Sequence, residues 1–188
     1  KGYRLYPDGT PIELEIIIVS GWSDWIRSAQ VVSQNLNKIG VKTKVKTYDF
    51  GAWISRMQKG DFQLSIGWTE KGSTPYNLYK GMMSPDYLKP LGEVADVNWH
   101  RFSSDKADIL LKKYEQTSDE KEIKRIIYEL QKIFVESAPS IPLFAEASWA
   151  ECNTTYFTNF PSAENPYGTL SPNYEHENLF LMLNVRPR

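Results

Sequence analysis

The stretch ELEIIIVSGWSDWIRSAQVVSQNLNKIGVKTKVKTY, residues Glu13–Tyr48, changes its apolar period twice and in doing so indicates the fold. Residues Glu13–Ser20 are largely β-branched and apolar, which is typical of a strand buried on both faces. Between Gly21 and Gly40, apolar residues recur every three or four positions, which predicts an amphipathic helix. Residues Val41–Thr47 then alternate with lysines, as in a half-exposed strand. This order predicts a βαβ unit with parallel strands.

The rest of the chain continues the α/β pattern and then becomes irregular. The expected elements are a helix at Gly51–Lys59, a strand at Phe62–Trp68, a short helix at Tyr76–Met83, a helix at Ser104–Gln116, a helix from a capping box at Thr117 and Glu120 to Pro139, and strands at SIPLF (140–144) and ASWAEC (147–152). The sequence therefore predicts an α/β fold with a mixed sheet flanked by helices. From Asn153 onward the pattern predicts little regular structure before the apolar LFLMLNV.

Composition limits the classes of partner. The chain has 188 residues, enough for one domain or one domain with an extension. It carries 22 Lys and Arg against 23 Asp and Glu, so its net charge of −1 gives no electrostatic reason to expect nucleic acid. No apolar run reaches the roughly 18–20 residues of a membrane span. The first residues, KGYRLYPDGT, include neither Met nor a leader, and we interpret the chain as a piece of a longer protein.

The sequence gives no positive sign of catalysis or of a cofactor. It has no phosphate-binding glycine loop of the Walker or Rossmann type and no HExxH motif. His100 and His176 lie too far apart in the chain to favour a metal pair. Cys152 is the only cysteine, and a buried apolar thiol is expected there. Asp24 and Glu70 would make a carboxylate pair if they faced each other, as in a glycoside hydrolase, but solvated caps and helix faces are the better interpretation.

Aromatic residues gather where the predicted strands end. Trp22 and Trp25 follow the first strand, Phe50 and Trp53 follow the second, and Trp68 closes the third. Parallel strands have their carboxyl ends at one edge of the sheet, which is where α/β proteins bind ligands. Each ring alone fits a core or rim position equally well. Five rings at three strand ends favour a groove for a sugar or a peptide, in which the rings cover apolar faces of the ligand.

Three long segments resemble one family. They are PDGTPIELEIIIV, AQVVSQNLNKIGVKTKVKTYDFGAWISRMQKGDFQLSIGW and NWHRFSSDKADILLKKYEQTSDEKEIKRIIYELQKIFVESAPSIPLF. Their motifs and order resemble the C-terminal lobe of the extracytoplasmic solute-binding proteins of ABC transporters, the oligopeptide/dipeptide-binding class known as bacterial extracellular solute-binding protein family 5. The resemblance covers most of the chain.

The resemblance implies a two-lobed receptor with a type II periplasmic-binding-protein fold that closes on its ligand like a hinge. Residues 1–153 would form the C-terminal lobe, and residues 154–188 would be an irregular tail that crosses back to the N-terminal lobe. The implied partners are a small-molecule ligand, that N-terminal lobe and the membrane permease. The implied location is periplasmic or extracytoplasmic, with membrane association through the transporter or a lipid anchor.

Two positions of the family's pattern bear on the ligand. In peptide-binding members, an acidic residue three positions beyond the GW tryptophan holds the peptide ammonium group, and a basic residue three positions before it meets a carboxylate. Here these positions are Lys71 and Ser65. Lys71 would repel an ammonium group, although it would attract a carboxylate, and Ser65 has no charge. The departure favours an uncharged ligand.

The expected function is therefore capture of an oligosaccharide, a β-linked gluco- or manno-oligosaccharide, with Trp68 as a ring platform and Glu70 and Lys71 as polar rim groups. An oligopeptide receptor is the alternative within the family. A glycoside hydrolase fragment and a bare interaction domain are alternatives of other classes. The candidate ligand-binding residues are Trp22, Trp25, Phe50, Trp53, Ser65, Trp68, Glu70, Lys71 and Asn77.

Overall fold

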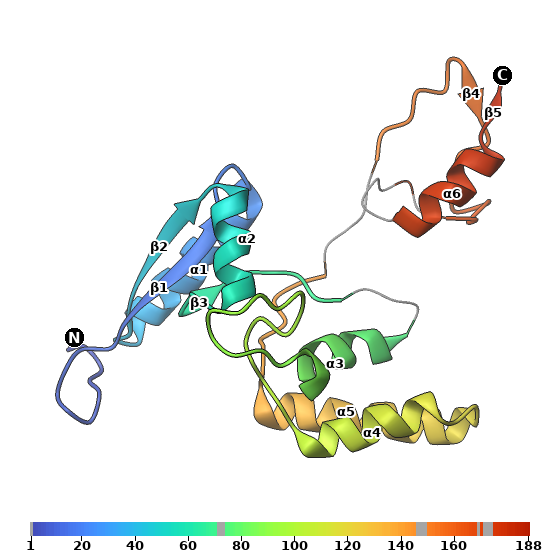
Figure 1. The fold of residues 1–188 in the computed structure, drawn as a ribbon. Coiled ribbons are helices and arrows are strands. Elements are labelled where there is room, and N and C mark those ends of the chain that lie inside the picture. Colours follow the sequence, from blue (N-terminus) through green and yellow to red (C-terminus); the bar gives the residue numbers. More distant parts are fainter. Residues whose placement is uncertain (1, 71–73, 146–149, 169, 171–174) are drawn as a thin grey trace. The chain divides into compact units, whose positions relative to one another are not determined.

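A computed structural model describes residues 2–70, 74–145, 150–168, 170 and 175–188 of the chain (Figure 1). These residues form two compact units, one that ends at Ile141 and one that begins at Pro142. The expected division into a lobe at residues 1–153 and a tail at residues 154–188 stays a prediction. Within the described residues, no helix is both long enough and apolar enough to cross a membrane.

The first unit contains a three-stranded parallel sheet with β1 in the centre. Strand β1 (Glu13–Val19) pairs with β2 (Lys42–Tyr48) along its whole length and with β3 (Leu64–Ser65) at Ile16 and Ile17. The predicted α/β class is confirmed, and the three strands run parallel. Strand β3 is shorter than predicted at both ends; at its amino end, the side chain of Gln63, not its backbone, accepts the Glu15 amide hydrogen bond at 2.8 Å.

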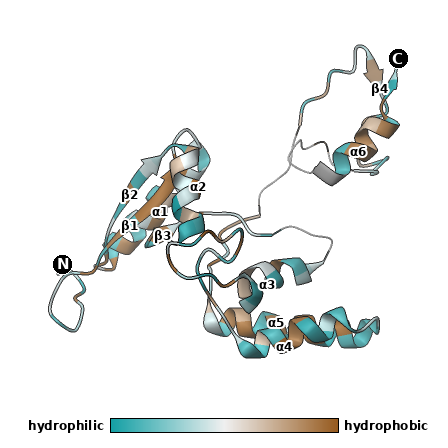
Figure 2. Ribbon diagram, viewed as in Figure 1, coloured by the Kyte–Doolittle hydropathy of each residue, from teal (hydrophilic) through white to brown (hydrophobic). Residues whose placement is uncertain are grey.

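One helix covers each face of this sheet (Figure 1). Alternate side chains of β1 point to opposite faces. Ile16 and Ile18 pack with Trp25 of α1 (Ser23–Lys38), and Ile17 and Val19 pack with Trp53 of α2 (Phe50–Lys59). Figure 2 accordingly shows β1 as strongly hydrophobic. The continuous apolar run of β1 thus reflects burial on both faces.

Three further helices form a second core in the same unit. They are α3 (Pro75–Met83), α4 (Asp105–Glu115) and α5 (Glu120–Ser137), and a short 3₁₀ helix, η1 (Pro85–Tyr87), follows α3. Tyr79, Leu111 and Leu130 are among the buried side chains that join them. The predicted capping box is displaced: the Asp119 side chain caps α5 by accepting from the Lys121 amide, and Thr117 accepts from the Asp119 amide instead.

The connection between η1 and α4 returns to the sheet layer. The Gly92 amide donates to Lys59 O at 2.8 Å, and the Ala95 amide donates to Gln58 O at 2.9 Å. Both acceptors lie in the last turn of α2, where helix carbonyls lack intrahelical partners. This connection therefore brings residues of the long irregular region beside α2.

The last part of the chain differs from two predictions. The prediction of a strand at SIPLF is wrong, because residues 140–145 form no strand. Pro142 lacks an amide hydrogen for strand pairing, and the Ile141 side chain is 78% exposed. Much of the expected strand at residues 147–152 lies outside the described residues. The region expected to be irregular contains the antiparallel strands β4 (Phe157–Thr158) and β5 (Arg186–Pro187) and the helix α6 (Glu175–Asn184), which uses most of the LFLMLNV segment.

Burial of β1 gives a direct test of the sheet layer. Ile18 is fully buried against α1, so Ile18→Ala is expected to lower the free energy of unfolding by about 2–5 kcal/mol. Ile109→Ala, at a 55% exposed position of α4, is the matched control and should change it by less than about 0.5 kcal/mol. Urea unfolding midpoints measure both. Equal effects of the two substitutions would contradict the packing described above.

Candidate functional site

The carboxyl edge of the sheet carries a continuous cluster of aromatic rings. Trp22 lies 4.9 Å from Trp25 and 5.9 Å from Phe50 between ring centroids, and 6.4 Å from Trp68. Trp53 lies 5.3 Å from Trp68. The structure thus brings together all five rings that the strand ends predicted. They meet because β1, β2 and β3 are parallel and each chain exit carries one or two rings.

A sixth ring, Trp99, completes the cluster and was missed by the sequence reasoning. Its ring stands edge-on to Trp68 at 5.2 Å and 81°, and edge-on to Trp53 at 6.2 Å and 84°. Its indole N–H lies 3.1 Å from Ala95 O and 3.0 Å from Asp96 O. Trp99 belongs to the irregular region, so no apolar period marked it. Its place in the NWHRF segment was the one available signal.

The cluster has a buried base and an exposed rim. Trp53 is fully buried and Trp25 is 7% exposed, so both rings serve mainly as packing surfaces. Trp68 is 41% exposed and Phe50 is 49% exposed, while Trp22 is half-buried. Trp68 and Phe50 both contact Trp22, and exposed apolar patches often mark binding surfaces. Trp68 and Phe50 therefore offer the open ring surface of this edge.

Ser65 is occupied within the fold. Its hydroxyl group accepts a hydrogen bond from the Trp53 indole N–H at 3.1 Å and donates to Ile17 O at 2.9 Å. The side chain thereby connects the base of the aromatic cluster to the central strand. A hydroxyl group held between two protein partners is poorly placed to anchor a ligand carboxylate.

The polar candidates lie on or near α3. Glu70 rests on this helix, since a Cβ atom at Gly81 would lie only 2.5 Å from Glu70 Cγ. Asn77 is half-buried in the first turns of α3, and its amide donates to Thr74 O at 3.4 Å. Lys71 lies outside the described residues. Glu70 therefore lies against α3, and Asn77 lies within this helix.

An ionic cluster holds α3 against the end of α4. Lys80 Nζ lies 2.7 Å from Glu115 Oε1, and the Tyr76 hydroxyl group donates to the same oxygen. The Tyr76 and Tyr114 rings stack at 4.4 Å and 11°. The hydrogen bond from Lys80 lowers the pKa of Glu115, and the same bond raises the pKa of Lys80. Burial is the main reason that the pKa of Tyr76 is raised. The charges of Lys80 and Glu115 are thus paired with each other within the fold.

The remaining candidates for chemistry are occupied or isolated. His100 Nε2 lies 2.9 Å from Met82 O, and burial lowers the pKa of this imidazole. Cys152 is a half-buried free thiol. Within the part of the chain that the structure describes, no group of three or more His, Cys, Asp or Glu residues is arranged to hold a metal ion.

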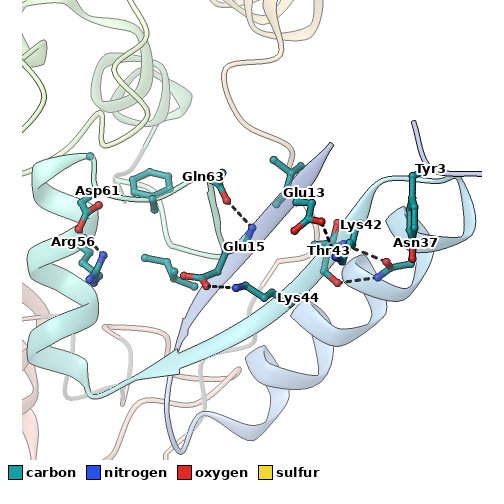
Figure 3. A pocket seen from close by; sticks show the side chains of 14 residues that line it. Tyr3, Glu13, Glu15, Asn37, Lys42, Thr43, Lys44, Arg56, Asp61 and Gln63 are labelled. Atoms are coloured by element: carbon teal, nitrogen blue, oxygen red, sulfur yellow. Dashed lines mark hydrogen bonds and ion pairs between the residues drawn. The ribbon is translucent and has the colours of Figure 1, made fainter. Parts of the chain in front are cut away.

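A groove of about 700 Å³ lies at the opposite, amino edge of the sheet (Figure 3). Its charged side chains pair among themselves: Lys42 with Glu13 at 2.6 Å, and Arg56 with Asp61 at 2.5 Å. Glu15 lies 3.4 Å from Lys44. A ligand there would have to compete with these existing pairs, whereas the aromatic rim has open surface. The rim is therefore the candidate site.

Comparison with known proteins agrees with this geometry. Residues 1–88 match the family described as "Bacterial extracellular solute-binding proteins, family 5 Middle". The chain is similar to this family over these residues. The match spans the sheet, α1 and α2, and the exit of β3 that carries Trp68.

Curated relatives match over longer stretches. Di/tripeptide-binding protein 4 of Pseudomonas aeruginosa is 27% identical over 117 residues, which are 62% of this chain and 21% of that protein. Heme-binding protein A of Haemophilus influenzae is 26% identical over 151 residues, which are 77% of this chain and 26% of that protein. The chain spans about a fifth to a quarter of the length of these relatives.

Solved structures share the fold. A periplasmic oligopeptide-binding protein of Thermotoga maritima with bound mannohexaose matches with a TM-score of 0.87 at 23% identity, over 100% of this chain and 35% of that one. A periplasmic binding protein of Helicobacter pylori in complex with the peptide STSA matches with a TM-score of 0.59 at 25% identity, over 68% of this chain and 24% of that one. The resemblance to a periplasmic-binding-protein fold is thereby confirmed.

The hydrogen bond between Ser65 and Trp53 can be tested by mutation. Ser65→Ala is expected to cost about 1–3 kcal/mol of folding free energy, because it leaves the buried Trp53 indole N–H without an acceptor. In the double variant with Trp53→Phe, the loss should be smaller than the sum of the two single losses, and urea unfolding measures this coupling. Ser118→Ala, at an exposed position between α4 and α5, is the control. Strict additivity would rule out the bond.

Proposed function

We propose that this chain is the C-terminal ligand-binding lobe of an ABC importer's solute receptor and that it captures a β-linked gluco- or manno-oligosaccharide. The observation that carries the proposal is the aromatic cluster at the carboxyl edge of the sheet, with Trp68 and Phe50 exposed over a base of buried indoles. Flat rings bind the apolar faces of sugar residues, while nearby polar groups take up the hydroxyl hydrogen bonds.

The family's acidic and basic anchor residues are both replaced in this chain, which supports a neutral ligand. Ser65 replaces the basic residue, and its hydroxyl group is already bonded to Trp53 and Ile17. Lys71 replaces the acidic residue that would hold an ammonium group. An ionised peptide terminus in an apolar site needs a paired charge. A saccharide needs none.

The comparisons support both ligand classes that the family contains. The Thermotoga maritima structure holds mannohexaose, which supports a saccharide for a chain of the same fold. Di/tripeptide-binding relatives support the second candidate, an oligopeptide. The ring cluster and the lost anchors favour the saccharide.

The proposed receptor works outside the cytoplasm with a membrane permease and a second lobe. Residues 154–188 would cross back to that lobe. Exposed apolar side chains of the second unit support this role: Leu179, Phe180, Met182 and Leu183 of α6 are 52–80% exposed, and Figure 2 shows part of α6 as hydrophobic. An exposed apolar surface of this kind is typical of an interaction site.

Calorimetry on the full-length receptor tests the function. Cello- or manno-oligosaccharides of four to six units, at about micromolar to millimolar concentration, should bind saturably and remain intact in the product analysis. Saturable binding of di- or tripeptides instead would select the peptide alternative. Shortened saccharides among the products would indicate a glycoside hydrolase. Binding of neither ligand class would favour a protein contact surface.

Trp68 is expected to contribute a large share of the binding energy. Trp68→Ala in the full-length receptor should weaken saccharide binding by about 1–3 kcal/mol, as loss of an aromatic anchor commonly does. Trp68→Phe should retain part of the affinity because a ring remains. Tyr128→Ala, at a 57% exposed position of α5, is the matched control and should bind like the wild type. Unchanged affinity in Trp68→Ala would exclude this ring from the site.

A further inference from the structure

Arg101 gathers carbonyl groups from three separate parts of the first unit. Its Nη2 donates to Gln58 O at 2.7 Å, in the last turn of α2, and to Glu93 O at 2.9 Å, in the connection after η1. Its Nη1 donates to Trp99 O at 3.2 Å. A planar guanidinium can hold several acceptors in a fixed geometry, which a lysine ammonium cannot do. One side chain therefore ties the Trp99 segment to the end of α2.

This arginine acts through backbone carbonyls. Among the described residues, the ion pairs do not include Arg101. The negative end of the α2 dipole favours a cation at this position. Burial lowers the pKa of Arg101, and its Nε is buried without a hydrogen-bond partner. Burial of this cation is unfavourable, and its hydrogen-bond partners are backbone carbonyl groups. This arrangement indicates that Arg101 fixes the local backbone.

The turn around Trp99 is held in an uncommon conformation. Asn98 and Arg101 have φ values of 54° and 57°, a region that residues other than glycine rarely occupy. The buried Asn98 side chain forms two bonds to Phe102: Nδ2 donates to Phe102 O at 2.7 Å, and Oδ1 accepts from the Phe102 amide at 3.0 Å. Such conformations persist where the surroundings determine them strongly. Trp99 is thus fixed from both sides.

The fixed Trp99 ring in turn restricts the orientation of the Trp68 ring. It stands edge-on to Trp68, and it lies over Gly67, where a Cβ atom would come within 3.2 Å of Trp99 Cζ3. The rings of Trp22 and Trp25 also lie beside Trp68, each with a distance of 6.4 Å between ring centroids. The exposed ring therefore has its orientation set by neighbouring indoles before any ligand arrives.

We propose that Arg101 is a positioning residue for the ligand platform: by holding the Asn98–Arg101 turn on the end of α2, it sets the Trp99 edge that orients Trp68. The effect on ligand affinity rests on the proposed function, because it presumes that Trp68 contacts the saccharide. The effect of Arg101 on the orientation of the rings does not depend on the proposed function. Preorganisation of this kind raises affinity by removing ordering costs from the binding step.

Spectroscopy of the ligand-free, full-length protein tests the positioning directly. Arg101→Met should reduce the near-UV circular dichroism of the coupled indoles and increase acrylamide quenching of tryptophan fluorescence, while the far-UV spectrum stays unchanged. Arg101→Lys should lie between wild type and Arg101→Met. Arg125→Met, which removes an exposed arginine of α5 that pairs with Glu122, should leave both signals unchanged.

The affinity measurement uses mannohexaose as the probe. Arg101→Met is expected to weaken binding by on the order of tenfold through loss of preorganisation. Wild-type near-UV and quenching signals in folded Arg101→Met would overturn the proposal. If Arg101→Met fails to fold, Trp99→Phe keeps Arg101 and the turn but shortens the ring edge, and unchanged Trp68 quenching there would equally overturn it. A wild-type protein that binds no saccharide would refute the proposed function, while the spectra still decide the positioning.

Discussion

Burial of β1 on both faces is the constraint on which the rest of the first unit depends. Ile16 and Ile18 commit one face to α1, and Ile17 and Val19 commit the other to α2. Parallel strands need crossover connections, and the helices α1 and α2 in these connections cover the two faces of β1. Once β2 and β3 run parallel to β1, their chain exits share one edge. The rings that follow the strands are then neighbours without any direct attraction between distant sequence segments.

The two edges of the sheet carry different kinds of side chain. At the amino edge, Lys42 and Glu13 or Arg56 and Asp61 neutralise each other on exposed side chains (Figure 3). At the carboxyl edge, aromatic rings predominate, and the Ser65 side chain beneath them is hydrogen-bonded to Trp53 and Ile17. A surface of this kind can bury ligand area without stripping water from an ion. It suits the proposed neutral ligand better than a charged one.

Local periodicity explains how far the sequence could predict this architecture. The βαβ unit follows from period-two and period-3.6 patterns, and the five rings could be assigned to one edge because each lies within a few residues of a strand end. Trp99 could not, because its position depends on Arg101 and on positive φ angles at two residues that are not glycine. SIPLF was misread for a related reason: its composition suits a strand, yet strand formation needs a pairing partner, which composition does not reveal.

The same dependence on partners bears on the ligand. In the proposed site, the Trp68 ring would act together with Trp99, Trp22 and Trp25, whose rings contact it and restrict its orientation. A rigid indole platform selects for ligands whose own faces are rigid and repeated, as in a pyranose chain, over flexible peptides that must first be ordered. Charge complementarity would have served a peptide receptor at the Lys71 and Ser65 positions. For the proposed neutral ligand, discrimination would have to come from shape, which the proposed network from Arg101 to Trp68 would set.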